Sequence, residues 1–341
     1  MSRAKSLQSY LLSRVLLAPL MLWAIATLVF LLLRATPGDP VDAILGPKAP
    51  PEVRQQLRAQ LGLNLPLPLQ YLHYLGDLLR GDLGTSLTSQ GERVTAIIAR
   101  HFPATAELAI ASLVIALVVG LGVGLATAAR PDSRRDAAGR LFGIVTYALP
   151  PFWAAMLVQL LFAVQLGWFP IGTRYPVTLE PPLGPTGLYT VDALLQGDWR
   201  ACGLALWYLA LPAGTLGLLL SGIFERIGRV NLRLALQSDY VDAARARGIP
   251  ERRILFNHAL RNALIPLVTV LGLTLAALLG GALLIETTYA WPGLANRLFE
   301  AISLRDYSTV QGIVVFFALL VVLASVAVDA LNALIDPRIR Y

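Results

Sequence analysis

The sequence predicts an all-α membrane protein whose chain crosses the bilayer six times. Of its 341 residues, 56% are hydrophobic and only 14% are charged, which is too few charges to cover a soluble protein of this length. Uncharged runs of about 20 residues recur along the chain, each long enough for a hydrocarbon core of roughly 30 Å. Arginines gather in alternate connections between these runs, as they do on the cytoplasmic side of membrane proteins.

Six spans are predicted from the uncharged runs: residues 15–33, 108–129, 141–173, 201–224, 264–285 and 308–328. The third run exceeds one straight span, and Pro150 and Pro151 predict a kink near its start because proline removes a helical hydrogen bond. Arg3, Lys5 and Arg14 precede the first span and predict a cytoplasmic N-terminus, and six spans then return the C-terminus to the same side. A cleaved signal peptide is the alternative for the first run, which is longer than usual and has no convincing cleavage site.

Charge, cysteine and motif content argue against several classes of function. The net charge is +7, but the basic residues lie scattered between apolar spans without aromatic residues that could stack bases, so nucleic-acid binding is not expected. Cys202 is the only cysteine, which excludes an internal disulfide. No GxxxxGK[ST] phosphate loop occurs, and His73, His101 and His258 are far apart in the predicted topology. We therefore expect no catalytic residue, metal or cofactor, and energy must come from a partner.

Residues 35–100 are polar and rich in turns, and they are predicted to form an external cap. Residues 36–40, TPGDP, form a rigid turn cluster. Short helices are expected at residues 51–61 and 69–79, because Gly62 and Gly81 follow them. An ordinary solvated loop that only shields the helix ends is the alternative.

The second span carries one acid and a series of glycines. Glu107 in its predicted first turn is most simply a partner for the helix dipole at the outer interface, with a role in transport as the alternative. Gly120, Gly122 and Gly124 predict close helix packing. Residues 174–200 are too polar to embed and are expected outside.

A polar, arginine-rich block at residues 238–266 separates the fourth and fifth spans. Ser238 or Asp239 suits the cap of a first helix, and Gly248 suits its left-handed end. Pro250 suits the first turn of a second helix that continues towards the fifth span. The block predicts two helices that meet at a sharp bend in water.

Within this block, Asp242-Ala243-Ala244, Gly248 and Leu260 resemble the EAA loop of ABC importer permeases. In that family the loop inserts a short coupling helix into a groove on a cytoplasmic ATPase. The resemblance assigns this contact to Asp242, Ala243, Ala244, Arg245, Arg247, Gly248, Arg252 and Arg253. The arginines alone could simply mark a cytoplasmic loop, but that alternative does not explain the alanine pair or the glycine spacing.

Other stretches narrow the resemblance to the dipeptide and oligopeptide (peptide/nickel) branch, and to its B-type subunit. Asp242 stands where the general pattern has Glu, and Arg261 stands where it ends in Leu-Pro; both departures resemble that branch. The cap, the TGLYTVDALLQGDW segment and the tail 336–341, DPRIRY, are also similar to it. The similarity therefore runs from the first span to the last residue. It implies the type I importer permease fold.

The resemblance also implies an activity and a set of partners. The chain would take up di- or oligopeptides across the bacterial cytoplasmic membrane, surrounded by lipid. It would act with a second permease subunit, as a heterodimer, with two ATPase subunits that bind the ATP, and with an external solute-binding protein. Nickel, glutathione or another small solute is the alternative cargo. An ion-driven secondary transporter is the alternative of a different class, but it predicts an internal repeat or midplane acids that are not evident.

The last connection, residues 286–294, supplies two candidate gate residues. In the family this stretch folds back near the outer mouth of the pathway, so the resemblance implies Glu286 and Trp291 as gate residues. An interfacial loop with an aromatic anchor is the alternative. The predicted organisation is a first span plus cap at residues 1–100 and a permease core at 101–341 that carries the coupling loop at 238–266.

Overall fold

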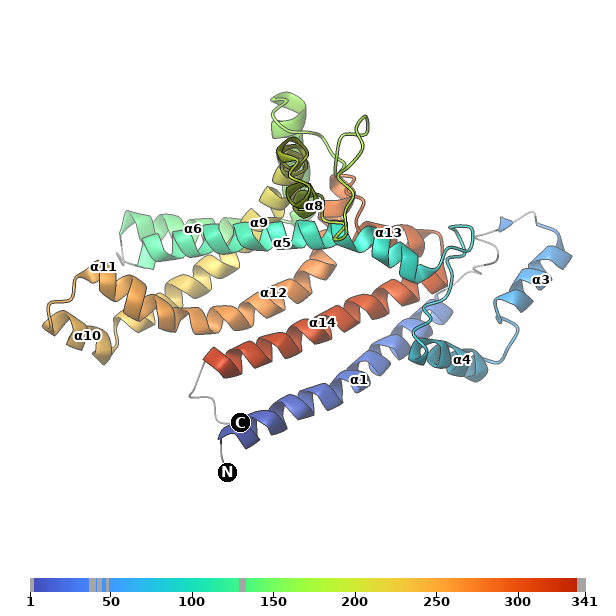
Figure 1. Ribbon diagram of the computed structural model, residues 1–341, viewed down its shortest axis with the longest axis horizontal. Helices are drawn as coiled ribbons and strands as arrows, with labels where there is room; N and C mark the ends of the chain where they lie inside the picture. Colours follow the sequence, from blue (N-terminus) through green and yellow to red (C-terminus); the bar gives the residue numbers. More distant parts are fainter. Residues whose placement is uncertain (1–2, 37–40, 42–44, 47–48, 129–132, 336–341) are drawn as a thin grey trace. The chain divides into compact units, whose positions relative to one another are not determined.

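A computed structural model describes residues 3–36, 41, 45, 46, 49–128 and 133–335. The predicted turn cluster, apart from Thr36, and the tail at 336–341 lie outside these residues. The described residues form helices joined by turns and loops (Figure 1). Their β-type pairing is limited to one isolated bridge, between Thr85 and Arg93.

The helices follow one another as α1 (Arg3–Ala35), α3 (Pro51–Gln60), α4 (Leu67–Leu79), α5 (Val94–Ala128), α6 (Arg134–Ala148), α7 (Pro151–Val158), α8 (Tyr189–Leu195), α9 (Trp199–Leu236), α10 (Asp239–Ala246), α11 (Glu251–Arg253), α12 (Leu260–Thr288), α13 (Leu294–Ser303) and α14 (Tyr307–Ile335). Two π-helical segments extend this series. One, η1 (Gln159–Gln165), continues α7, and the other, η2 (Ile254–Ala259), joins α11 to α12.

Four helices in the described part of the chain are long and apolar enough to cross a membrane, and two bent helix pairs raise the number to six. The four are Leu16–Ala35, Val94–Ala128, Trp199–Leu236 and Tyr307–Leu331. The first bent pair is α6 with α7 and η1, which turn by 102° at Pro150 and Pro151. This confirms the predicted kink. The second pair joins residues 251–264 to 266–275 at an angle of 51°.

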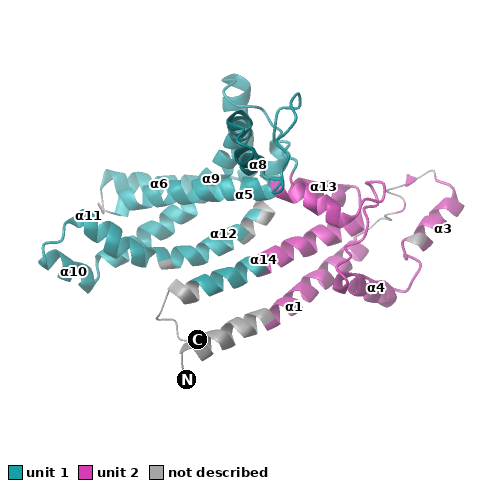
Figure 2. Cartoon of the chain, viewed as in Figure 1, with its two compact units in different colours: residues 1–13, 104–292, 323–341 teal, residues 14–103, 293–322 magenta. Residues whose placement is uncertain are grey.

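The chain forms two compact units, coloured separately in Figure 2. Unit 1 contains residues 1–13, 104–292 and 323–341. Unit 2 contains residues 14–103 and 293–322, so the cap helices α3 and α4 belong to the same unit as α13 and the first half of α14.

Unit 1 is held together by close packing of α5 on α9. A Cβ atom at Gly120 would lie 2.5 Å from the carbonyl oxygen of Ser221, and one at Gly124 would lie 3.1 Å from that of Glu225. The predicted role of these two glycines in close packing is confirmed: a side chain at Gly120 would clash with the α9 backbone, and one at Gly124 would require a small shift of α9. Gly122 has no such neighbour, so the prediction for that position was wrong.

Unit 2 has its own apolar cluster. It contains Val94 and Ile98 of α5, Leu294 of α13 and Ile313 of α14. Aromatic rings fix α4 on α1, since Phe30 stacks on Tyr74 with 5.6 Å between the ring centroids. The predicted cap helices are present, and Gly62 and Gly81 follow them with φ of +65° and +76°.

Two of the long helices extend well past their apolar runs. α5 begins at Val94 rather than near 108, and α9 continues to Leu236 rather than ending near 224. At 1.5 Å per residue the 38 residues of α9 measure about 57 Å, far more than the hydrocarbon core. The ends of a helix are set by capping and turn residues. The edge of an apolar run therefore does not mark a helix boundary.

Candidate functional site

The predicted bend between α10 and α11 is present, at one end of unit 1 (Figure 2). Gly248 has φ of +72°, the left-handed conformation predicted for it. The amide of Gly248 donates to the carbonyl of Arg245 at 2.9 Å, and that of Ile249 donates to Ala244 at 3.2 Å, which closes the end of α10. Pro250 occupies the position just before α11, one residue earlier than predicted.

The predicted side-chain cap of α10 is absent. Ser238 has the backbone conformation of a cap residue, but its hydroxyl donates to the carbonyl of Ala235 at the end of α9. Only two residues, Gln237 and Ser238, separate the end of α9 from the start of α10. The hydroxyl therefore satisfies a free carbonyl of the preceding helix instead of a free amide of the next one. Asp239 is the first residue of α10 rather than its cap.

The helix after the bend runs directly into a candidate span. α11, η2 and α12 follow without a gap. Val241 and Ala244 of α10 pack on Ile254 of η2. Ala259 and Ala263 pack in a second cluster with Leu232 of α9 and Ala128 of α5. The segment from α10 through η2, which we call the elbow, is thus packed onto α5 and α9 and continues into α12.

The eight predicted coupling residues divide by exposure. Seven lie on the surface: Asp242, Ala243, Arg245, Arg247, Gly248, Arg252 and Arg253. Ala244 is only 7% exposed and packs on Ile254, so it faces its own chain. Its small size allows α10 to pack on η2, whereas Ala243 presents its methyl group outward.

Arg245 is neutralised within the elbow. Its guanidinium lies 2.7 Å from Glu251 and 3.1 Å from Asp242. The hydrogen bond with Glu251 raises the pKa of Arg245 and lowers that of Glu251. In the part of the chain that the structure describes, no ion pair engages Arg247, Arg252 or Arg253, so these three cations remain available for an acidic partner.

A buried ionic network ties α6 to α9. Asp136 of α6 is fully buried and lies 2.7 Å from Arg233, with Arg140 at 3.4 Å and Arg229 at 3.8 Å. Arg229 also pairs with buried Glu225 at 2.7 Å. In the sequence, these arginines indicate only the cytoplasmic side of the membrane. The sequence feature that could have predicted the network is Asp136, a single acid among the arginines at the start of α6.

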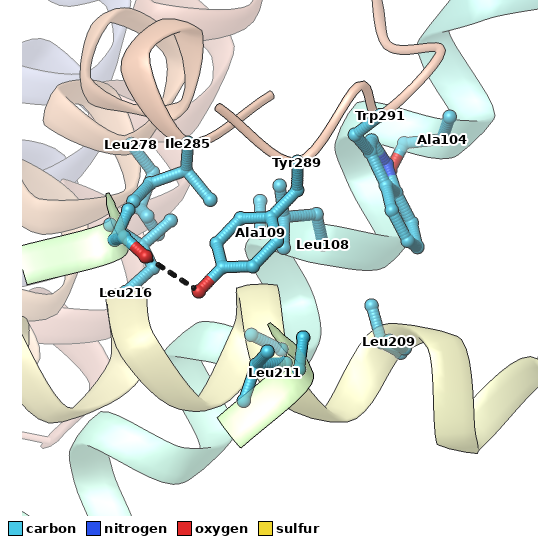
Figure 3. Packing of buried hydrophobic residues seen from close by; sticks show 13 residues of the cluster. Ala104, Leu108, Ala109, Leu209, Leu211, Leu216, Leu278, Ile285, Tyr289 and Trp291 are labelled. Carbon is cyan, nitrogen blue, oxygen red and sulfur yellow. Dashed lines mark hydrogen bonds between the residues drawn. The ribbon is translucent and has the colours of Figure 1, made fainter. Parts of the chain in front are cut away.

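The two candidate gate residues are buried. The indole N–H of Trp291 donates to the carbonyl of Ala104 at 2.8 Å, and its side chain has no exposed area (Figure 3). Glu286 is equally buried and accepts a hydrogen bond from the Thr105 hydroxyl at 2.5 Å. The backbone amide of Trp291 donates to the carbonyl of Glu286 at 2.8 Å.

Tyr289, between the two gate candidates, connects three helices. Its hydroxyl donates to the carbonyl of Ala155 in α7 at 3.3 Å and lies 3.0 Å from the hydroxyl of Thr215 in α9. Figure 3 shows the ring among Leu108, Ala109, Leu216 and Ile285. The end of α12 is thus closed against α5, α7 and α9.

Glu107 has a partner that the sequence did not reveal. It lies well inside α5 rather than in the first turn, because α5 begins at Val94, so the predicted dipole role was wrong. Arg174, in the connection after η1, donates to its carboxylate at 2.6 and 2.9 Å. Glu107 is 5% exposed and Arg174 is 6% exposed.

Comparison with known proteins gives a family match along nearly the whole chain. Residues 118–341 match the model of the binding-protein-dependent transport system inner membrane component. Residues 7–109 match the model of the N-terminal part of such membrane components.

Individual relatives cover the chain almost from end to end. The di/tripeptide transport system permease protein DppB of Pseudomonas aeruginosa is 38% identical over 94% of this chain and 95% of its own. The probable D,D-dipeptide transport system permease protein of Escherichia coli is 39% identical over 92% of both. The glutathione transport system permease protein of Salmonella choleraesuis is 36% identical over 98% of this chain and 99% of its own.

Proposed function

Because the chain belongs to the family of binding-protein-dependent transport system inner membrane components, we propose that it is the permease subunit of an ABC importer for di- and oligopeptides. The family places it in the inner membrane, which agrees with its long apolar helices. The observation that carries the proposal is the elbow. Seven of its eight expected coupling residues are exposed, and it is packed onto the helices behind it.

Peptides are the proposed cargo because relatives named for dipeptides and oligopeptides match at 33–39% identity over most of the chain. The glutathione permease at 36% identity supports a second candidate within the same machinery. Glutathione is itself a small peptide, so the two candidates differ in the cargo but not in the mechanism.

The proposed partners follow from the family and from the charges of the elbow. Two cytoplasmic ATPase subunits bind and hydrolyse ATP, and one of them receives the elbow. Arg247, Arg252 and Arg253 then contact acidic groups of that subunit, since they have no acidic partner among the described residues. A second permease subunit completes the pathway as a heterodimer, and an external solute-binding protein delivers the peptide to the cap.

Coupling requires a continuous physical connection from the elbow to the pathway. The elbow is packed on α9, and the Asp136 network joins α9 to α6. α6 turns at Pro150 into α7, whose Ala155 carbonyl accepts from Tyr289. A tilt of the elbow is therefore transmitted through α9, α6 and α7 to the end of α12.

Glu286 and Trp291 act as gate residues in this proposal. Both are buried and hydrogen-bonded to consecutive residues of α5, Ala104 and Thr105. Movement of the end of α12 away from α5 breaks both hydrogen bonds together. In this proposal the gate is closed when both hydrogen bonds are formed.

The proposal is tested by purifying the tagged chain after expression with its neighbouring reading frames. We expect a P-loop ATPase and a second six-span protein to copurify, and we expect vesicles that contain the complex and the binding protein to take up dipeptide only with ATP. Recovery of the chain alone, with uptake that does not need ATP, would contradict it.

A further inference from the structure

A polar pocket lies within unit 2, where the end of α1, the helix α4 and the first turns of α14 meet. Its volume is about 180 Å³. One water molecule occupies ~30 Å³ in the liquid, so the pocket has room for a small organic molecule. Its lining includes Arg34, Tyr74, Asp77, Asp82 and Gln311.

Three polar atoms of the lining have no hydrogen-bond partner among the residues that the structure describes. They are Arg34 Nη1, Tyr74 Oη and Gln311 Nε2. Gln311 is only 8% exposed, so solvent does not satisfy its amide. Native proteins rarely leave buried donors unsatisfied, and such groups call for an explanation in terms of a ligand or a function. The three atoms are almost inaccessible in this conformation, so small side-chain rotations must turn them towards a guest.

Arg34 is held in place without a carboxylate partner. Its guanidinium carbon lies 4.4 Å from the ring centroid of Phe30 and 5.4 Å from that of Tyr307. Two of its nitrogens donate to the Gln70 amide oxygen at 3.3 Å. Within the described part of the chain Arg34 has no carboxylate partner, so its positive charge is available to an anionic group once the side chain rotates towards the pocket.

Tyr74 and Gln311 add neutral donors beside that cation. Burial raises the pKa of the Tyr74 phenol to about 12, so the hydroxyl keeps its proton at neutral pH and can donate. The Gln311 amide nitrogen is also a donor. A cation with two neutral donors matches the planar oxygen pair of a carboxylate.

The two acids of the pocket determine which charge the ligand must have in addition to its carboxylate. Asp77 and Asp82 bring two negative charges against the single positive charge of Arg34. Both acids are exposed, so solvent weakens their repulsion, but their charges still disfavour a polyanion such as a phosphate. A molecule with both a carboxylate and an ammonium group satisfies it.

We propose that this pocket binds a small zwitterion, either a free amino acid or a dipeptide. Its carboxylate lies on Arg34, Tyr74 and Gln311, and its ammonium group lies towards Asp77 and Asp82. The site belongs to the unit that contains the cap, and its occupancy does not depend on how the elbow engages a partner.

The full-length chain in nanodiscs of zwitterionic lipid provides the test, with binding measured by calorimetry. The probes are alanine, alanylalanine, N-acetyl-alanylalanine and alanylalanine amide. We expect at least one of the two zwitterions to bind, and each blocked dipeptide to bind roughly tenfold more weakly than alanylalanine if the dipeptide is the guest, because it lacks one charged contact. Binding of alanine alone identifies the amino acid as the guest. Failure of both zwitterions to bind, or equal binding of a blocked and a free dipeptide, would overturn the proposal.

Substitutions place the binding in this pocket. Arg34→Gln should abolish measurable binding, and Tyr74→Phe and Gln311→Leu should each weaken it severalfold. The matched control is Arg80→Gln, because Arg80 is an exposed arginine at the end of α4 and does not line the pocket. The Arg80→Gln protein should bind the zwitterion with wild-type affinity. If Arg34→Gln does not fold, Tyr74→Phe and Gln311→Leu test whether the ligand binds in this pocket. Wild-type affinity in both would place the binding elsewhere and overturn the proposal.

Discussion

Arg174 donates two hydrogen bonds to one carboxylate oxygen of Glu107, at 2.6 and 2.9 Å, and the two buried side chains join α5 to the connection that precedes α8. The other carboxylate oxygen accepts from the amide and the hydroxyl of Thr190, at 2.8 and 2.7 Å. The Arg174 guanidinium also lies 3.7 Å from the ring centroid of Tyr189. Residues 174–190 are therefore fastened to α5 by a buried, hydrogen-bonded ion pair.

Glu107→Gln should destabilise unit 1 strongly. The substitution leaves the Arg174 cation buried without a counter-ion, and loss of one partner of a buried pair costs about 3–5 kcal/mol in the free energy of unfolding. We expect a clear fall in the melting temperature in detergent and faster proteolysis within residues 174–200. Glu180→Gln is the control, since Glu180 is an exposed acid of the same segment. Unchanged melting and proteolysis in Glu107→Gln would show that the pair does not hold the segment.

The partner of Glu107 could not be predicted from the sequence. The edge of the apolar run predicts a helix start near residue 108 and so places Glu107 at a helix dipole. The run shows which residues suit the hydrocarbon, but α5 starts at Val94 and extends beyond it. Nothing local to Glu107 identifies a partner 67 residues away, because the pairing depends on how the chain returns to α5 after η1.

Asp136→Asn should both destabilise the protein and loosen coupling. Arg140, Arg229 and Arg233 pair with Asp136, so its removal leaves cations repelling one another. The cost is smaller than the roughly 3–5 kcal/mol of a fully buried pair, because these arginines are 13–49% exposed. Because α6 then no longer follows α9, the number of peptides taken up per ATP hydrolysed should fall. The exposed neighbour Arg135→Gln should leave both quantities unchanged. A normal transport ratio in a destabilised Asp136→Asn protein would remove the network from the coupling pathway.

Gly248→Val should abolish transport while the protein still inserts into the membrane. The space around Gly248 is open, so the penalty comes from its φ of +72°, where an ordinary L-residue costs about 1–2 kcal/mol and a β-branched one more. Gly248→Asn is the matched control, since asparagine tolerates this conformation and should retain most uptake. Equal uptake by the Val and Asn variants would show that the bend is not needed.

Asp306 should give the stability of unit 2 a dependence on acid pH. Burial alone raises the pKa of this carboxyl, but hydrogen bonds from the Ser86 hydroxyl and the Thr309 amide outweigh burial and lower it. Because the pKa of Asp306 is lower in the folded than in the unfolded protein, its carboxylate stabilises unit 2 fully at pH values above the unfolded pKa of about 3.9. This stabilisation is lost as the pH falls through the lower pKa of the folded state. Wild type should therefore melt above Asp306→Asn at pH 7, with the difference shrinking below about pH 4. A difference that stays constant across this range would contradict the assignment.

The elbow was easier to predict than its surroundings because its signals are local. Gly248 and Pro250 mark the bend through their own backbone preferences, and the structure confirms the bend at that place. The kink at Pro150 and Pro151 was predictable for the same reason. The cap at Ser238 failed because its hydroxyl had a competing acceptor in the preceding helix, and the orientation of Ala244 depends on Ile254, which no local pattern specifies.

Adjacent alanines of the elbow allow the most direct test of the claim that it contacts an ATPase. Cys202, the only cysteine, is buried, so a cross-linking reagent should react with a cysteine introduced at Ala243 or Ala244 rather than with Cys202. Ala243 is exposed and Ala244 packs on Ile254. With the copurified ATPase in membranes and a short bifunctional reagent, we expect Ala243→Cys to cross-link to the ATPase and Ala244→Cys to react far less. A cysteine at Arg80, in the cap, should give no ATPase cross-link. Absence of any cross-link from Ala243→Cys in an intact complex, or an equal yield from Arg80→Cys, would contradict the coupling role of the elbow.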